Sequence, residues 1–90
     1  MRKVTVMEAV TTNTASAIQT ILGSVRENFV VQVYGTGTYT VVIEGSFNGV
    51  NFFTLDSMTA SEIATIPAVL YLRATTSGTS GASVNVWVGV

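Results

Sequence analysis

The chain has no cysteine and no histidine among its 90 residues. The first absence rules out disulfides and thiolate metal sites, and the second removes the usual general base and a common metal ligand. Five carboxylates remain, and a glycosidase would need two of them across a cleft that so small a domain has little room to form. We therefore predict that the protein is not an enzyme and binds no metal and no cofactor. The carboxylates are Glu8, Glu27, Glu44, Asp56 and Glu62.

Basic residues are also scarce, since only four cations, Arg2, Lys3, Arg26 and Arg73, are scattered along a chain of net charge -1. Binding to a phosphate backbone needs a basic stripe, so we expect no nucleic-acid partner. No apolar run approaches the roughly 18 residues that span a bilayer, so we expect no membrane contact. The segment after Met1 lacks the apolar core of a signal peptide, which predicts synthesis in the cytoplasm.

The low charge bears on association as well. About a quarter of the residues in an average soluble domain are charged. Here the charged fraction is 10% and the hydrophobic fraction is 48%. The surface must therefore be covered by uncharged polar residues or by other protein. We predict a homo-oligomer.

Apolar and polar residues alternate between segments rich in Gly, Asn, Ser and Thr, which indicates short β-strands. The chain length predicts one domain. With the alternation, this predicts an all-β fold, a single antiparallel β-sandwich of jelly-roll or similar type. Residues 1–28 are expected to add a strand pair or an arm. The segment 17–23 fits a strand or a helical turn, and 56–66 fits a crossover loop better than a helical turn. The expected strands are residues 3–9, 17–23, 29–34, 39–47, 50–55, 69–76 and 83–90.

The clearest local signal is the dipeptide Asn48-Gly49, which accommodates the two positive φ angles of a type I′ hairpin turn. A two-residue turn places Phe47 opposite Val50 and Gly45 opposite Phe52.

Two glycine-rich segments, 35–37 and 77–81, are expected to end strands as turns. In the expected strand 69–76, the alternation predicts that Leu70 and Leu72 face the core while Val69 faces outward.

The last strand is the most informative, because every second residue from Val84 to Val90 is valine and the single tryptophan, Trp87, lies on the other face. A tryptophan beside polar residues needs a cover, which is the same chain, another subunit or a ligand such as a glycan. We expect other aromatic and polar residues on outward faces to be covered in the same way. The candidate interface residues are Trp87, Tyr71, Arg73, Asn85, Tyr34 and Phe53.

Four segments carry a resemblance to a known group of proteins. They are Val-x-Val-x-Gly in 31–35, the segment 42–55 with Glu-Gly-Ser-x-Asn-Gly-x-x-Phe-x-x-Leu from residue 44 onward, Pro-x-x-Leu-Tyr-Leu-Arg-Ala in 67–74, and the Ser/Gly turn with alternating valines in 77–90. Together they cover about the last two thirds of the chain. In this order they resemble small β-sandwich structural proteins of tailed bacteriophages, although secreted carbohydrate-binding sandwiches use a similar hairpin.

The resemblance implies a virion protein, and we expect a capsid decoration or cement protein that stabilises the head through subunit contacts. Its partners would be further copies of itself and the major capsid protein or other virion proteins. A tail, neck or baseplate component is the alternative within the same class. A carbohydrate-binding module for host attachment and a subunit of a cellular appendage are the alternatives from other classes.

Overall fold

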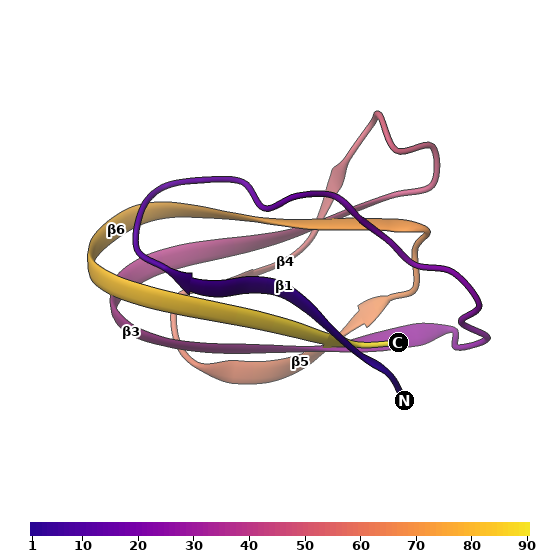
Figure 1. The fold of residues 1–90 in the computed structure, drawn as a ribbon, viewed down its shortest axis with the longest axis horizontal. Coiled ribbons are helices and arrows are strands. Elements are labelled where there is room, and N and C mark those ends of the chain that lie inside the picture. The colour runs from indigo at the N-terminus through magenta and orange to yellow at the C-terminus, as the bar shows by residue number, and fades with distance from the viewer.

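The computed structural model describes all 90 residues and contains six β-strands and no helix (Figure 1). No segment therefore forms a helix of the length and apolarity that crossing a membrane requires. The strands are β1 (Lys3–Val10), β2 (Gln19–Thr20), β3 (Asn28–Ser46), β4 (Phe53–Met58), β5 (Glu62–Pro67) and β6 (Tyr71–Gly89).

Two long strands, β3 and β6, form the body of the molecule. They run antiparallel and pair from Val30 opposite Gly89 to Ser46 opposite Tyr71. Both bend near their middles, at the left of Figure 1, so the paired ribbon folds back on itself. One layer holds the first half of β3 with the second half of β6, and the other layer holds the two remaining halves.

The other strands complete the two layers at their edges. In the first layer β5 pairs with β3 and β1 pairs with β6, which gives the order β5-β3-β6-β1. In the second layer β4 pairs with β3, while β2 and a bridge between Ala15 and Thr75 lie along β6. Counting each half of β3 and β6 as one strand gives the eight strands and two layers of a jelly roll. The predicted all-β sandwich is confirmed, and residues 1–28 supply one edge to each layer.

Two bulges in β6 produce the bend. Between the partners of Thr36 and Thr40, β6 uses two more residues than β3 does. Each extra residue turns the strand more strongly than regular pairing allows. Gly78 and Gly81 lie in these bulges with φ angles of 59° and 58°, which suit glycine far better than other residues.

Gly37 closes the bend from the β3 side. It has a φ of 76°, and a Cβ atom at this position would collide with the backbone of Gly81 and Ala82. The expectation that segments 35–37 and 77–81 end their strands is wrong. Pairing continues through both segments, since positive φ angles of glycine serve a bulge as well as a turn.

The core lies between the two layers and follows the predicted alternation. In β6 the valines at 84, 86 and 88 are at most 1% exposed, and Phe29, Val31 and Val33 of β3 lie beside them. The second layer contributes Val41, Ile43 and Leu72, all nearly inaccessible. Full burial of each such side chain is worth about 1.5–3 kcal/mol, so these rows hold the layers together.

The predicted hairpin turn after β3 is wrong in type and register. Gly45 pairs with Phe53 rather than with Phe52, and Gly49 has a positive φ while Asn48 does not. Side chains explain the longer loop. The Ser46 hydroxyl accepts hydrogen bonds from the backbone N–H groups of residues 48 and 49, and the Asn48 amide oxygen accepts from those of residues 50 and 51. These bonds satisfy the loop backbone without a tight turn.

Three smaller expectations are corrected. The strand expected over 17–23 is reduced to β2, because the chain there follows β6 only briefly. The segment 56–66 does cross between layers, but β4 and β5 take up most of it and only residues 59–61 connect them. Val69 is buried and Leu70 is 46% exposed, the reverse of the predicted orientation, because β6 begins only at Tyr71.

Candidate interaction surfaces

The six residues predicted to form an interface lie on three separate surfaces. Trp87, Asn85 and Tyr34 are on the outer face of the first layer, because each alternates with a buried residue of its strand. Tyr71 and Arg73 are on the outer face of the second layer by the same alternation. Phe53 lies at the end of the sandwich opposite the bend.

Trp87 lies in a row of outward side chains that crosses all four strands of the first layer. Thr5 of β1 and Gln32 of β3 are its neighbours on either side, and Ile63 of β5 follows beyond Gln32. Trp87 is half-buried, whereas Ile63 is 65% exposed. The second sheet packs on the valine face of β6, so it does not cover the indole.

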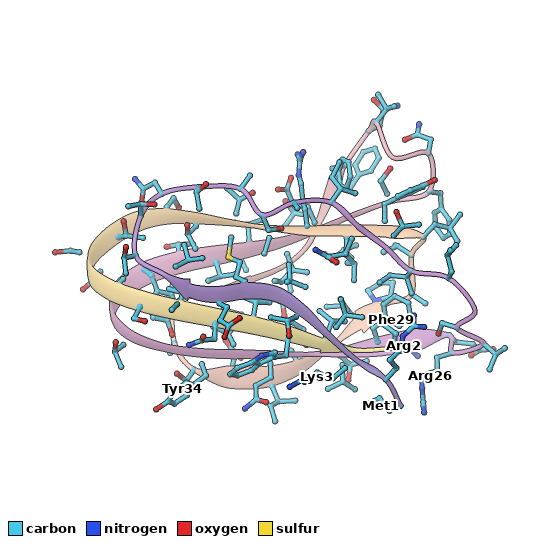
Figure 2. All side chains as sticks on the ribbon, in the orientation of Figure 1. Met1, Arg2, Lys3, Arg26, Phe29 and Tyr34 are labelled. Atoms are coloured by element: carbon cyan, nitrogen blue, oxygen red, sulfur yellow. The ribbon has the colours of Figure 1, made fainter.

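A groove runs beside this row, which we call the Trp87 groove. It has a volume of about 460 Å³ and is lined by Met1, Lys3, Val30, Gln32, Ile63, Trp87, Val88 and Gly89. Gly89 pairs with both Lys3 and Val30. Because glycine has no side chain, the surface beside the indole is recessed at this position. The Met1 side chain lies against Gly89, so the N-terminal residue covers part of the hollow. Figure 2 shows Met1, Lys3 and Tyr34 along the lower margin of the molecule.

Asn85 is partly exposed on this face and makes two hydrogen bonds within its own chain. Its side-chain amide donates to the Tyr34 carbonyl oxygen at 3.1 Å, and its amide oxygen accepts from the Ala9 N–H at 3.0 Å. Ala9 has a φ of 49° in an irregular part of β1, so its backbone needs such a partner. The neighbouring Tyr34 side chain remains 55% exposed.

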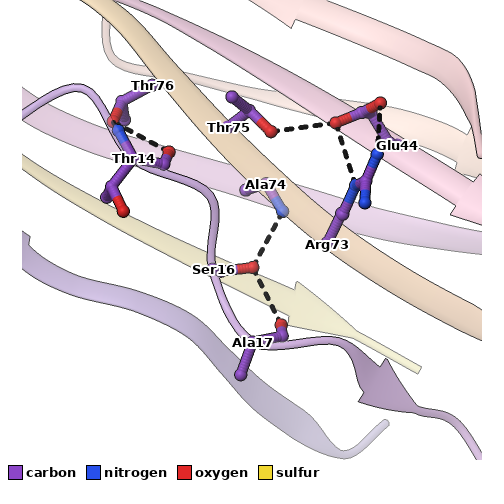
Figure 3. A network of polar contacts seen from close by, with 8 residues as sticks. All are labelled: Thr14, Ser16, Ala17, Glu44, Arg73, Ala74, Thr75 and Thr76. Carbon is purple, nitrogen blue, oxygen red and sulfur yellow. Dashed lines mark hydrogen bonds and ion pairs between the residues drawn. The ribbon is translucent and has the colours of Figure 1, made fainter.

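Arg73 is held by an ion pair on the outer face of the second layer (Figure 3). Its guanidinium donates two hydrogen bonds to the Glu44 carboxylate, at 3.2 and 3.3 Å, and the Thr75 hydroxyl donates a third at 2.9 Å. The hydrogen bonds from Arg73 lower the pKa of Glu44, outweighing the opposing effect of burial. The centre of the Phe52 ring lies 4.2 Å from the guanidinium carbon, as in a cation–π contact. Arg73 is therefore committed to contacts within its own chain.

The segment before β2 docks on β6 through hydroxyl groups, also seen in Figure 3. The Ser16 hydroxyl accepts from the Ala74 N–H at 3.0 Å, in the place of a strand carbonyl. The buried Thr76 hydroxyl donates to the Thr12 carbonyl oxygen at 2.7 Å and accepts from the Thr14 N–H at 3.1 Å. These bonds hold an irregular segment along the edge of the second layer.

The third surface lies where the chain leaves the sheets, and we call it the loop end. Segments 21–27, 47–52 and 68–70 meet there, at the right of Figure 1. Six large apolar side chains in or beside these segments are 46–97% exposed: Leu22, Val25, Phe47, Val50, Phe53 and Leu70. Of these, only Phe53 was among the predicted interface residues.

Two grooves flank Phe47 at the loop end. The larger, about 470 Å³, is lined by Gly45, Ser46, Phe47, Asn48, Asn51, Phe53, Leu55, Pro67, Ala68 and Val69. The smaller, about 100 Å³, is lined by Ile21, Ser24, Arg26, Phe29, Phe47, Ala68, Val69 and Leu70. Phe47 borders both and is itself 68% exposed. A projecting aromatic ring thus lies directly beside an apolar hollow.

No group of three or more acidic side chains comes together in a way that could hold a metal ion. The one ion pair of the chain is that of Arg73 with Glu44, so the other charged side chains do not form ion pairs. No protein-family model matches this sequence, and no significant match is found among curated proteins. Function must therefore be argued from the surfaces themselves.

Proposed function

We propose that the protein is a non-enzymatic structural component of a bacteriophage particle, which decorates the capsid and stabilises it by contacts between subunits. The observation that carries the proposal is the outer face of the first layer. There Trp87 and the exposed side chains of Met1 and Ile63 line a largely apolar groove, and Tyr34 is exposed on the same face. Monomeric proteins rarely expose such a patch, whereas protein interfaces are rich in aromatic residues.

The fold agrees with this role without deciding it. Jelly rolls are common in viral capsid proteins, and they are also common in lectins. Fold alone does not fix function, so the resemblance of the sequence to phage structural proteins adds the preference for a virion. A decorating subunit would bind only the assembled shell, and it would stabilise that state by mass action.

The test uses phage particles from the genome that encodes the chain, with and without an intact copy of the gene. We expect particles without the protein to assemble but to release DNA at a lower temperature, and added purified protein to restore the release temperature. Immunogold labelling should mark the heads. Label confined to tails would replace decoration by a tail, neck or baseplate role. Absence of the protein from purified particles would reject the virion assignment.

The contact face is tested by Trp87→Ala. Truncated aromatic hot spots typically cost about 2 kcal/mol of binding or more, which is roughly a thirtyfold loss of affinity for the particle. The matched control is Thr38→Ala at the exposed bend, which should bind normally. Equal binding by both variants would remove the Trp87 groove from the proposed contact.

A second candidate function is favoured by the same groove. Its indole, the Gln32 amide and the Lys3 ammonium would suit a sugar that stacks on the ring and hydrogen-bonds at its rim. Loss of glycan binding in Trp87→Ala, with particle binding and thermal unfolding unchanged, would favour a carbohydrate-binding module for host attachment.

A further inference from the structure

The loop end carries an inference of its own, separate from the proposed binding to a phage particle. Its exposed apolar side chains are not part of the core cluster, to which Ile21, Phe29 and Val69 beneath them belong. We propose that two copies of the chain associate through their loop ends about a twofold axis, with Phe47 of each copy inserted into the larger groove of the other.

The shape of the loop end supports a second copy as the occupant. A twofold contact requires one surface to carry both a feature and its complement, since residue i meets j and j meets i. Phe47 supplies the projecting ring, and the groove between Phe53, Leu55 and Val69 supplies the hollow beside it. Gly45 lets the Leu55 and Val69 side chains pack directly on the backbone at the edge of this groove, because a Cβ there would lie 2.7 Å from Leu55.

The exposed area is also sufficient. The six apolar side chains of the loop end together expose on the order of 700 Å², close to the roughly 800 Å² that each partner contributes to a standard interface. The net charge of -1 leaves little repulsion between copies.

The loop end carries one positive and one negative side chain, which can pair between two copies of the chain. Arg26 and Glu27 are adjacent, exposed and outside the chain's one ion pair. Across a twofold axis, Arg26 of one copy can meet Glu27 of the other. This arrangement favours a second copy over an unrelated apolar partner.

The first experiment measures the mass of the purified protein by sedimentation between 5 and 200 µM, concentrations on the order of those at which standard interfaces form. We expect a species of twice the 9.5 kDa chain mass. Phe47→Ser should weaken dimerisation at least tenfold with little change in thermal unfolding, because the ring is mostly exposed. Tyr34→Ser, which removes a similarly exposed ring from the first layer, should leave the dimer intact. A monomeric wild-type protein at the highest concentration would overturn the proposal.

Charge reversal tests the geometry. Arg26→Glu and Glu27→Arg should each weaken the dimer several-fold, and the double variant should recover most of the loss. Failure of the double variant to recover would reject this pairing across the axis. A cross-link gives an independent check, since the chain has no native cysteine. With dissolved oxygen as the oxidant, Asn51→Cys beside the groove should form more disulfide-linked dimer than Ser80→Cys at the bend.

These outcomes are separate from the test of the proposed function. A monomer that binds particles would reject the twofold contact and leave decoration standing. A dimer that binds no particle would do the reverse.

Discussion

The two ends of the sandwich are built on different principles. At the bend, the exposed residues are polar or glycine, and the backbone remains in continuous strand pairing through Gly37, Gly78 and Gly81. At the loop end the chain leaves the sheets, side chains of Ser46 and Asn48 shape the loop, and large apolar residues project into solvent.

The comparison distinguishes residues that the fold requires from residues that the fold does not explain. The sequence of the bend is explained by the backbone geometry that it must adopt. The apolar side chains of the loop end are 46–97% exposed, and burying them in an interface is the simplest physical reason for their presence. Substitutions at the bend should therefore change stability, whereas those on the loop-end surface should change association.

The largest effect is expected for Gly37→Ala. The new Cβ would collide with the backbone of Gly81 and Ala82, which cannot move aside as a flexible side chain can. The φ of 76° at position 37 is also unfavourable for alanine. We expect a loss of about 3 kcal/mol or more in the free energy of unfolding, measured with urea.

Gly78→Ala is the matched control for that variant. Its φ is also positive, at 59°, but nothing lies within 4 Å of the added atom. We expect a loss of about 1 kcal/mol from the backbone conformation alone. Equal losses for the two variants would show that close approach at Gly37 does not define the bend.

Asn48→Ala probes how side chains build the loop end. The amide oxygen accepts hydrogen bonds from two loop N–H groups and from the Ser46 hydroxyl, which is buried. We expect a loss of about 1–2 kcal/mol in unfolding free energy, as for a helix cap with similar bonds. Asn48→Asp keeps the acceptor and should stay close to the wild type. A loss as large in Asn48→Asp would mean that the acceptor is not what shapes the loop.

The same contrast explains how far the sequence predicts the fold. Alternation is a local property, so the inward valines of β6 and the row from Phe29 to Val33 follow directly from it. A glycine with positive φ fits a turn or a bulge equally well, and the choice depends on pairing between Thr36–Thr40 and a segment forty residues away. The continuous bent strands were missed for this reason.

The candidate surfaces show the same limit. The position of Trp87 on an outer face follows from the alternation in β6. The loop end was not predicted, because Leu22, Phe47 and Leu70 meet there only after the chain has folded. The predicted two-residue turn pairs Phe47 with Val50, whereas the longer loop in the structure leaves both side chains exposed. This wrong pairing is a second reason why the loop end was not predicted. The intramolecular partners of Asn85 and Arg73 cannot be predicted from a single strand, because Tyr34, Ala9 and Glu44 lie on other strands.

A smaller effect, and of opposite sign, is expected for Tyr39→Phe beside the bend. The Tyr39 hydroxyl is buried without a hydrogen-bond partner, and its ring lies directly under Gly35. Removing an unsatisfied buried hydroxyl should raise the unfolding free energy by about 1 kcal/mol. Thr76→Val, which removes a buried hydroxyl with partners, should instead lower it by about 1–2 kcal/mol. Destabilisation by both variants would indicate that Tyr39 does find a partner in solution.

The smallest effect belongs to the ion pair between Glu44 and Arg73. Glu44 has a lowered pKa in the folded chain, chiefly because Arg73 donates hydrogen bonds to it. A lowered folded pKa stabilises the protein above the ordinary carboxyl pKa of about 4.3, and this stabilisation is lost as pH falls through the folded value. Arg73 is 34% exposed, so solvent screening limits the contribution to about 1 kcal/mol or less. Urea unfolding of wild type and Glu44→Gln should therefore differ by a constant amount between about pH 6 and 8, and the difference should shrink as the pH falls below the ordinary carboxyl pKa and through the lowered one. A difference that persists unchanged at low pH would assign the effect of the substitution to packing around Phe52 and Thr75 rather than to charge.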